Sequence, residues 1–350
     1  MKRPTLRDIA DIAKVSHVAV SLALRKHPSI SKKTRERIAE IAKQIGYRPD
    51  PALQALMAYR RGAKPSSYQG TLAWINNHRA KPDNLKSHFP NYYLGAQERA
   101  VELGYQLEEF RLVDLNMDFG RLSSVLQSRN IQGLIFPPQE GQRHISQKSF
   151  DWEKFSLIAF GFSLMRPRID AVVNSMFNSA RTAVRKLRSL GYRRIGFAIE
   201  TLSNERTGQN FLAGFLIEQR RFSPAETVPI LLLPKSSELK SEQVFRKWFK
   251  QNKPDAVLSV SHIVASWFQA LGDSRRGCGL ALMDLPDNNT EISGILQNNR
   301  IVGRTAVDIL VSKIHMNERD IPVTPRVTLI EGTWIAGTTA PRVSGAGKSA

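Results

Sequence analysis

Three short segments near the start of the chain alternate apolar and polar residues with the period of an α-helix. The apolar positions lie three or four residues apart, which gives each helix one apolar face and leaves the other face polar. They are Leu6, Ile9, Ala10 and Ala13 in the first segment, Val20, Ala23 and Leu24 in the second, and Ile38, Ile41, Ala42 and Ile45 in the third. The pattern predicts three helices that pack together.

Residues with capping chemistry mark where these helices begin. Thr5 and Asp8 form a capping pair for the first helix, Ser16 precedes the second, and Ser31 precedes the third. Two short helices joined by a tight turn are the arrangement of a helix-turn-helix, whose second helix enters the DNA major groove. A basic three-helix bundle without a DNA-binding role stays open as the alternative from the pattern alone.

Beyond a short polar and basic linker at Tyr59–Tyr68, apolar runs typical of strands alternate with helical runs. This alternation predicts parallel α/β sheets with helices on both faces, a fold that binds ligands at the carboxyl ends of its strands. The expected strands are Thr71–Asn76, Gly133–Phe136, Leu157–Phe162, Arg194–Ile199, Ala256–Val260, Gly279–Leu285 and Val327–Ile330, and the expected helices include Tyr92–Leu103, Ser179–Leu190, Glu205–Glu218 and Ile301–Ile314.

Charge is concentrated where the three helices are expected. The 350 residues carry a formal net charge of +20. Residues 1–64 hold fifteen Lys or Arg against five acidic residues, so half of the excess lies in this short segment. A basic module of this kind favours a polyanionic partner, and double-stranded DNA is the one that fits a helix-turn-helix.

The remaining composition narrows the class of protein. Cys278 is the only cysteine, so no disulfide framework or zinc-binding spacing is present, and we expect no metal. The N-terminal residues lack the apolar core of a signal peptide, and the longest near-apolar run, Ser156–Met165, is too short to span a bilayer. No phosphate-binding loop or catalytic motif is found. We therefore expect a cytoplasmic protein that is not an enzyme, has no cofactor and does not bind membranes.

Three motifs in the first sixty residues resemble the N-terminal domain of the lactose repressor (LacI)/GalR family of transcriptional regulators. They are the run from Asp8 to Leu24 (DIADIAKVSHVAVSLAL), the run from Ser29 to Ile38 (SISKKTRERI) and the run from Gly46 to Pro51 (GYRPDP). The resemblance implies a hinge helix at Pro51–Arg60, with Leu56 as the side chain that wedges into the minor groove; prising apart a base step in this way bends the duplex.

Residue chemistry divides the expected DNA contacts into two groups. Hydroxyls, helix N-termini and positive charge suit phosphates, whereas side chains on the outer face of the second helix suit base edges. The first group is Thr5, Ser16, Ser31, Thr34 and Arg35, and the second is His17, Val18, Ser21 and Leu22, with Arg25 beside them. Compared with the family, Leu22 replaces a residue that is usually polar, and Lys14 replaces the glycine of the turn. Apolar Val18 and Leu22 can contact thymine methyl groups but cannot form a bidentate hydrogen bond to guanine.

The rest of the chain also resembles the LacI family, whose regulatory half is shared with periplasmic sugar-binding proteins. Matching segments include Gly95–Tyr105, Pro254–Val257 and Glu331–Trp334. The resemblance implies two Rossmann-like lobes joined by three crossovers, with an effector between them. The expected domains are 1–49 (helix-turn-helix), 50–68 (hinge helix and linker), 69–340 (effector binding and dimerisation) and 341–350 (flexible tail). Lobe one is expected at about 69–163 plus 297–325, and lobe two at about 164–296 plus 326–340.

The expected effector site departs from the family pattern. Phe211 replaces the sugar-binding arginine, Ser261 and His262 replace an Asn-Asp pair, and Phe162 follows Gly161 where a polar residue is common. These changes remove groups that grip vicinal hydroxyls, so the ligand is a sugar or another metabolite, flatter or less polar. The expected effector-binding residues are Asn76, Phe162, Phe211, Ser261, His262, Asp284 and Gln297. A core position remains open for Phe162, Phe211 and Trp267.

Taken together, the residues and the resemblance predict a DNA-binding transcriptional regulator, a repressor that binds a palindromic operator as a homodimer under the control of a small effector. The dimer contact is expected to include the helix Tyr92–Leu103. Two alternatives stay open. One is an architectural DNA binder whose regulatory half has lost its ligand, and the other is a solute-binding protein of the periplasmic type.

Overall fold

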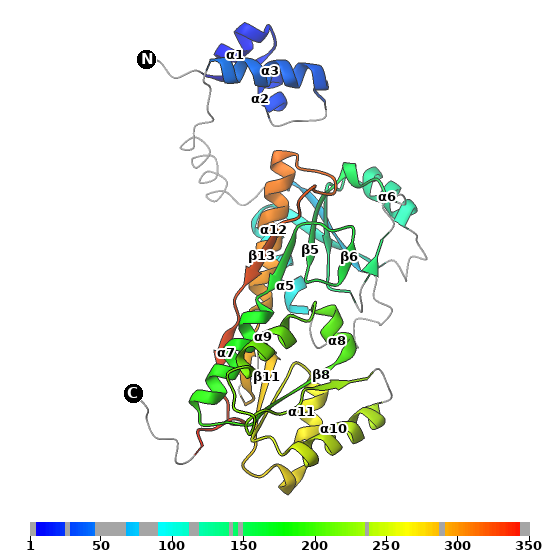
Figure 1. Cartoon of the computed structure of the whole chain (residues 1–350). Coiled ribbons are helices and arrows are strands. Elements are labelled where there is room, and N and C mark those ends of the chain that lie inside the picture. The colour runs from blue at the N-terminus through cyan, green and yellow to red at the C-terminus, as the bar shows by residue number, and fades with distance from the viewer. Residues whose placement is uncertain are drawn as a thin grey trace.

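A computed structural model describes residues 5–24, 29–45, 68–76, 90–111, 119–139, 143–145, 150–234, 238–286 and 291–343 (Figure 1). The N-terminal part has three helices, α1 (Leu6–Ala13), α2 (His17–Leu24) and α3 (Lys32–Gln44), as the sequence predicts. They share one core, in which Ile9, Val20 and Ile38 are fully buried. Since every helix contributes to this core, each fixes the angle of the other two.

The expected caps are present in the N-terminal bundle. The Thr5 hydroxyl accepts the backbone N–H of Asp8, and the Asp8 carboxylate accepts the backbone N–H of Thr5 at 2.6 Å, which completes a capping box. Lys14 ends α1 with φ +49°, a left-handed conformation that glycine adopts at less cost. Arg37 of α3 donates to the carbonyl oxygen of Ala13 at 3.0 Å, which secures the end of α1. The tight turn before α2 is therefore held from both sides.

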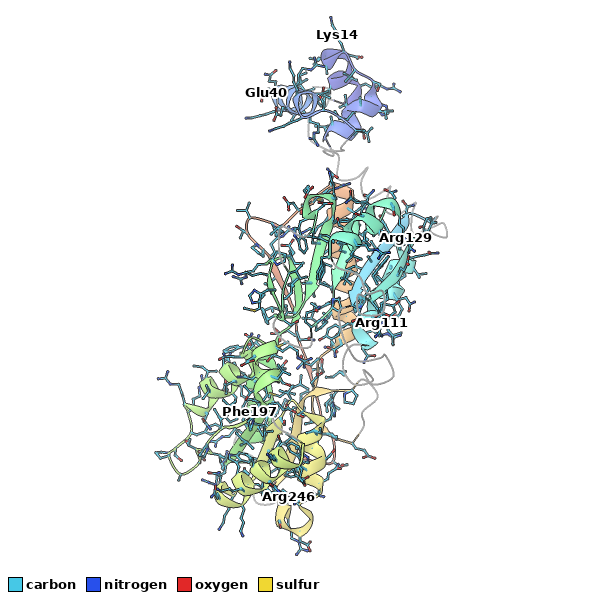
Figure 2. The ribbon with its side chains drawn as sticks, turned by 90° about the vertical axis from the view of Figure 1, so that its right-hand side faces the viewer. Lys14, Glu40, Arg111, Arg129, Phe197 and Arg246 are labelled. Atoms are coloured by element: carbon cyan, nitrogen blue, oxygen red, sulfur yellow. The ribbon has the colours of Figure 1, made fainter. Side chains whose placement is uncertain are left out.

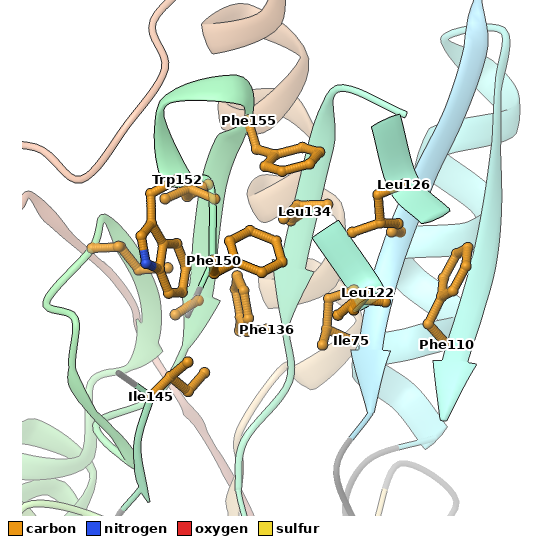
Figure 3. Packing of buried hydrophobic residues seen from close by; sticks show 14 of the residues in the cluster. Ile75, Phe110, Leu122, Leu126, Leu134, Phe136, Ile145, Phe150, Trp152 and Phe155 are labelled. Atoms are coloured by element: carbon orange, nitrogen blue, oxygen red, sulfur yellow. The ribbon is translucent and has the colours of Figure 1, made fainter. Parts of the chain in front are cut away.

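Lobe one is a parallel six-stranded sheet in the order β13-β7-β5-β3-β1-β2. Helix α6 lies on one face and helices α5 and α12 lie on the other, each over its own apolar core. Figure 3 shows Phe136, Phe150 and Trp152 packed together in the core beneath α6. The elements are β1 (Gly70–Asn76), α5 (Pro90–Glu102), β2 (Tyr105–Arg111), α6 (Phe119–Ser128), β3 (Gly133–Phe136), β5 (Ser156–Phe160), β7 (Ala171–Asn174), α12 (Asn299–Met316) and β13 (Val327–Ile330). The short strands β4 (Arg143–His144) and β6 (Leu164–Arg166) pair separately, and a 3₁₀ turn covers Trp152–Lys154.

Lobe two repeats this plan with the strand order β14-β12-β11-β10-β8-β9, in which only β14 runs antiparallel to its neighbour. Helices α7 and α9 cover one face, and α10 and α11 cover the other. The elements are α7 (Met176–Ser189), β8 (Ile195–Glu200), α8 (Thr201–Arg206), α9 (Asn210–Gln219), β9 (Leu231–Leu233), α10 (Glu238–Asn252), β10 (Ala256–Ser259), α11 (His262–Gln269), a 3₁₀ turn (Gly272–Arg275), β11 (Gly279–Leu285), β12 (Ser293–Leu296) and β14 (Thr333–Ile335).

The chain crosses between the lobes three times, which confirms the predicted two-lobed α/β architecture. The crossings follow β7, β12 and β13. Their positions differ from the expected limits, because β7 and β13 both pair within the sheet of lobe one. The first crossing therefore lies after Asn174 instead of near residue 163, and the third lies after Ile330 instead of near residue 325. Apolar strands continue each sheet beyond the loops where the sequence pattern places the boundary.

The expected helix Glu205–Glu218 is wrong in one respect, since it consists of the two helices α8 and α9. Between them, Gly208 and Gln209 both have positive φ values, +61° and +60°. Two successive residues in this conformation cannot continue a right-handed helix. The break gives α9 its own start, close to the boundary between the lobes. Within the described residues, no helix is both long and apolar enough to cross a membrane.

Candidate functional site: a DNA-recognition face and an interlobe cleft

The outer face of α2 presents a mixed surface of apolar and polar side chains. Val18 has 58% of its surface exposed, the highest value among the apolar residues of this helix. His17 is also exposed, whereas Ser21 and Leu22 are half-buried. Val20 and Ala23 point the opposite way into the core. The four residues that sequence analysis assigns to base edges thus lie outside the buried stripe of α2.

The hydroxyls expected to bind phosphates are engaged in the free protein as helix caps. Ser16 Oγ accepts the backbone N–H of Ala19 at 3.1 Å, and Ser31 Oγ accepts that of Thr34 at 3.3 Å. The Thr5 hydroxyl donates to the carboxylate of Asp8 at 2.7 Å, so an acidic group occupies its donor position. The hydroxyls of Ser31 and Thr34 also bond to each other at 2.8 Å, and Thr5 must release Asp8 before its hydroxyl can donate to a phosphate. Arg35 and Thr34 lie in the first turn of α3, and the positive end of that helix favours an anion there.

Two of the expected DNA contacts, Arg25 and Leu56, lie outside the described residues, as does the expected hinge helix.

The crossing segments bring polar groups together in the buried junction between the lobes. The Tyr92 hydroxyl, at the start of α5, donates to Asn174 Oδ1 at 2.5 Å, and Asn174 Nδ2 donates to the carbonyl oxygen of Gln297 at 2.8 Å. Burial raises the pKa of Tyr92 above its ordinary value, and the Asp284 carboxylate raises it further, while Arg206 acts in the opposite direction. Asp284 and Arg206 belong to lobe two, so charged groups of that lobe act on a buried hydroxyl of lobe one.

A second polar group follows strands β8 and β10, where lobe two ends in the cleft. Ser261 Oγ donates to Glu200 Oε1 at 2.5 Å, and Ser259 Oγ accepts the backbone N–H of Ser261 at 3.1 Å. The other carboxylate oxygen of Glu200 and the side-chain oxygen of Asn204 are buried without a hydrogen-bond partner. Buried acceptors are almost always satisfied, so two unsatisfied ones at the same sheet edge mark a place where a donor is missing.

The structure distributes the expected effector residues unevenly. Phe162 is half-buried and lies at the lobe boundary, where Gly208 approaches it so closely that an added Cβ would stand 3.4 Å from the Phe162 ring. Ser261, His262 and Asp284 are half-buried at the carboxyl ends of β10 and β11. Asn76 ends β1 and donates to Glu109 at 2.5 Å. These residues lie near the ends of strands where the two lobes meet.

Two residues that were expected to bind the effector, Phe211 and Gln297, have structural roles instead. Phe211 is 3% exposed and packs in the core of lobe two, which is the core position that sequence analysis leaves open. Gln297 is 2% exposed, and its side-chain amide donates to the carbonyl oxygen of Met283 and accepts a hydrogen bond of 3.4 Å from Ser179. Its side chain therefore holds the second crossing in place. Trp267 is also buried in the core of lobe two.

Sequence reasoning missed Tyr92, Glu200, Asn204 and Arg206 as cleft residues. Glu200 is the last residue of β8, and a polar residue that directly follows an apolar strand of a parallel sheet is a usable signal. Asn204 and Arg206 lie in α8, which the sequence pattern does not separate from α9.

Arg111 ends β2 at the edge of lobe one nearest lobe two (Figure 2). No group of His, Cys, Asp and Glu in the described residues is arranged to hold a metal ion.

Comparisons with known proteins agree with both halves of this description. The model of the family "Bacterial regulatory proteins, lacI family" matches residues 5–50. The chain is 42% identical over 52 residues to the probable HTH-type transcriptional repressor ExuR of Bacillus subtilis. This alignment covers 15% of this chain and 16% of that protein. The alignments with the curated relatives span between 16% and 56% of those proteins.

Solved structures match the whole fold at low sequence identity. The transcriptional regulator CelR in complex with cellobiose has a TM-score of 0.59 and 17% identity, over 96% of this chain and 100% of that one. The lac repressor dimer bound to operator and the anti-inducer ONPF has a TM-score of 0.57 and 18% identity, over 97% and 100%. These similarities are to transcription regulators, which are not enzymes. Residues 5–50 therefore match the N-terminal domain of the bacterial regulatory proteins of the lacI family, and the rest of the chain shares the two-lobed fold of these solved structures.

Proposed function

We propose that this protein is a transcriptional repressor that binds a palindromic DNA operator as a homodimer and responds to a small effector in the interlobe cleft. Residues 1–49 would form the DNA-binding domain, 50–68 the hinge and linker, 69–340 the regulatory part and 341–350 a tail. The observation that carries the proposal is the exposed outer face of α2 on a bundle that matches the family model. A recognition helix needs such a face to reach base edges.

The chemistry of α2 favours an operator read partly through thymine methyl groups. Val18 and Leu22 supply apolar surface, while His17 and Ser21 supply hydrogen-bonding groups to the same face. Selection of bound duplexes from a random library by the full chain tests this: we expect an inverted repeat with A·T pairs at the positions nearest Val18. Recovery of unrelated sequences would favour the architectural DNA binder instead.

Dimerisation through α5 is supported by the surface of that helix. Leu94 and Val101 are 41% and 61% exposed, which is unusual for apolar residues of a helix that also faces a core. Gly95 and Gly303 allow α5 and α12 to approach each other closely, since an added Cβ at Gly303 would stand 2.1 Å from the carbonyl oxygen of Tyr92. The two helices form one rigid layer on which a partner could dock.

We expect binding to DNA to fall steeply with salt, because phosphate contacts release counterions. Affinity for the selected operator should drop by roughly a thousandfold between about 50 and 200 mM salt. Arg35→Gln, at the start of α3, should reduce the slope of log affinity against log salt by about one. Lys43→Gln removes the same charge at the other end of α3 and should leave the slope nearly unchanged. Fluorescence anisotropy measures both, and equal slopes for the two variants would contradict a phosphate contact at Arg35.

The effector is proposed to present hydrogen-bond donors to lobe two. Glu200 and Asn204 each offer a buried oxygen without a partner, and the Asp284 carboxylate lies at the end of the neighbouring strand β11. Three acceptors in one cleft suit a ligand with several hydroxyl or amino groups. The cellobiose complex of CelR supports a carbohydrate-like ligand for this fold. Phe162 on the opposite side of the cleft offers an apolar face to the same ligand.

Asn204→Leu tests this assignment. Burying an acceptor without a partner costs about 1–3 kcal/mol, so the variant should unfold at the same or a higher temperature than the wild type when no ligand is present. A sugar that raises the melting temperature of the wild type should no longer do so in the variant. Screening mono- and disaccharides by thermal denaturation measures both effects. Asn252→Leu serves as control, because the side-chain amide of Asn252 donates to the carbonyl oxygen of Trp248 in its own helix, α10, away from the proposed effector site. A variant that loses stability but keeps the ligand response would refute the assignment.

A further inference from the structure

Lobe two contains a cavity of about 670 Å³ at the end of its sheet opposite the interlobe cleft. Its lining includes the segments that lead into β10 and β11, whereas the cleft lies where these strands end. Figure 2 shows Arg246, one of the lining residues, at the end of lobe two farthest from lobe one. The cavity is therefore separate from the proposed effector site.

One face of α10 and the turn after it supply most of the positive charge in this cavity. Arg246 is followed at i+3 and i+4 by Phe249 and Lys250, so these three side chains lie on one side of α10, and Lys253 follows directly after the helix ends. Arg276 adds a fourth cation from the segment before β11. The floor between them is apolar, since Phe249 is 7% exposed and Leu271 and Pro254 also line the cavity.

The negative charge in the lining is already engaged. Asp255 is the only acidic residue among the lining residues, and its two carboxylate oxygens accept the backbone N–H groups of Arg193 and Arg194 at 2.7 and 2.9 Å. Burial, helped by the nearby Asp255 carboxylate, raises the pKa of the Cys278 thiol to about 12, so the thiol stays uncharged at neutral pH. The cavity thus keeps a clear excess of positive charge.

Among the four cations that line the cavity, Lys250 and Lys253 are the ones available to pair with a ligand. Arg246 pairs with Glu242 at 2.6 Å, and Arg276 pairs with Asp273 at 3.3 Å. In the part of the chain that the structure describes, neither Lys250 nor Lys253 takes part in an ion pair. Because both lysines line the same cavity, their positive charges favour a bound dianion.

The turn that carries Lys253 is held in place before any ligand arrives. Arg194 donates to the carbonyl oxygen of Asn252 at 2.6 Å and to that of Lys253 at 3.4 Å. Arg246 is fixed in a similar way by Glu242 and by the carbonyl oxygen of Ala270. Because the turn and Arg246 are already held, less backbone and side-chain entropy is lost when the site binds an anion.

We propose that this cavity binds a small organic phosphate monoester, with the phosphate held by Lys250 and Lys253 and the organic part on the floor of Phe249 and Leu271. The volume is within the range of small-molecule sites, which is about 300–1,000 Å³. The concave shape and apolar floor disfavour the DNA backbone as the ligand, because a duplex presents its phosphates on a convex surface. The site is independent of the proposed operator and effector.

Titration calorimetry of the full chain with phenyl phosphate, inorganic phosphate and phenol tests the proposal. Phenyl phosphate should bind at least about tenfold more tightly than inorganic phosphate, because only it covers the apolar floor, and phenol should not bind measurably. Equal affinities for the two phosphates would overturn the assigned ligand class.

The double variant Lys250→Gln/Lys253→Gln should weaken phenyl phosphate binding by at least about tenfold. The matched control is Lys240→Gln/Lys247→Gln, which removes the same charge from exposed positions of the same helix that do not line the cavity. An equal loss in both double variants, or unchanged binding in the first, would place the phosphate elsewhere and refute the site. A first variant that keeps phenyl phosphate but loses affinity for random-sequence DNA would show that the lysines bind nucleic acid, which also refutes it.

Discussion

Replacing Asp170 by alanine should lower the free energy of unfolding by about 3–5 kcal/mol, because it leaves a buried charge without its partner. Asp170 is 2% exposed and accepts hydrogen bonds from Lys313 at 2.8 Å and from the Arg326 guanidinium at 2.7 Å. Lys313 is itself 5% exposed, in helix α12. The variant would thus strand an ammonium group inside lobe one and loosen the segment that leads into β13.

Chemical denaturation at neutral pH measures this loss. Asp308→Ala is the matched control, since Asp308 also pairs with an arginine, Arg99, at 2.7 Å, but has 48% of its side chain exposed. An exposed pair of this kind contributes at most about 1 kcal/mol. Similar losses in the two variants would show that burial does not set the value of the Asp170 pair.

The same carboxylate makes stability depend on pH. Burial on its own would raise the pKa of Asp170, but the hydrogen bonds from Arg326 and Lys313 outweigh it and hold the pKa below its ordinary value. A carboxyl whose pKa is lowered by folding contributes its full stabilisation above the unfolded-state pKa, about 3.9, and loses it as the pH falls through the lower folded-state pKa. The wild type should therefore lose stability in this acid range, and Asp170→Asn should lose less there.

The sequence predicted strands best where apolar residues follow one another in a buried run. The expected strands Gly279–Leu285 and Gly133–Phe136 have the bounds seen in the structure, and nearly all of their residues are buried. Strand β2 was missed, because Tyr105–Arg111 lies at the sheet edge and carries two exposed glutamates, Glu108 and Glu109. Strand β7, Ala171–Asn174, was also missed. The polar residues that an edge strand such as β2 can carry are a consequence of tertiary structure, and they interrupt the apolar pattern that marks a strand in the sequence.

The two candidate sites also differ in how far the local sequence predicts them. The recognition face of α2 is contained in one helix, so the spacing of Val18 relative to Val20 and Ala23 was enough to predict which side chains are exposed. The cleft is assembled from both lobes: Tyr92 and Asp284 are far apart in the sequence, and only the three crossings bring them together. Gln297 was predicted at the right place with another role, since the sequence does not show that Ser179 and Met283 engage its side chain.

Val18→Glu should abolish specific DNA binding while leaving the fold intact. Val18 is 58% exposed, so the longer side chain meets solvent and not the core in the free protein. On DNA, a carboxylate at this position loses the contact with a thymine methyl and faces the phosphate-rich groove. One lost base contact costs about 1–3 kcal/mol, and the repulsion adds to it, so affinity for the selected operator should fall by more than about a hundredfold.

Ile12→Glu is the matched control for this prediction. Ile12 is 55% exposed on α1, in the same bundle, and the substitution introduces the same charge. A loss confined to Val18→Glu assigns the effect to the face of α2, because both variants change the net charge equally and are equally compatible with folding. Anisotropy titrations with operator and with random-sequence DNA measure it, with circular dichroism to verify the helices. If Ile12→Glu weakened operator binding as much as Val18→Glu, the effect would come from overall charge, and α2 would lose its assignment as the recognition helix.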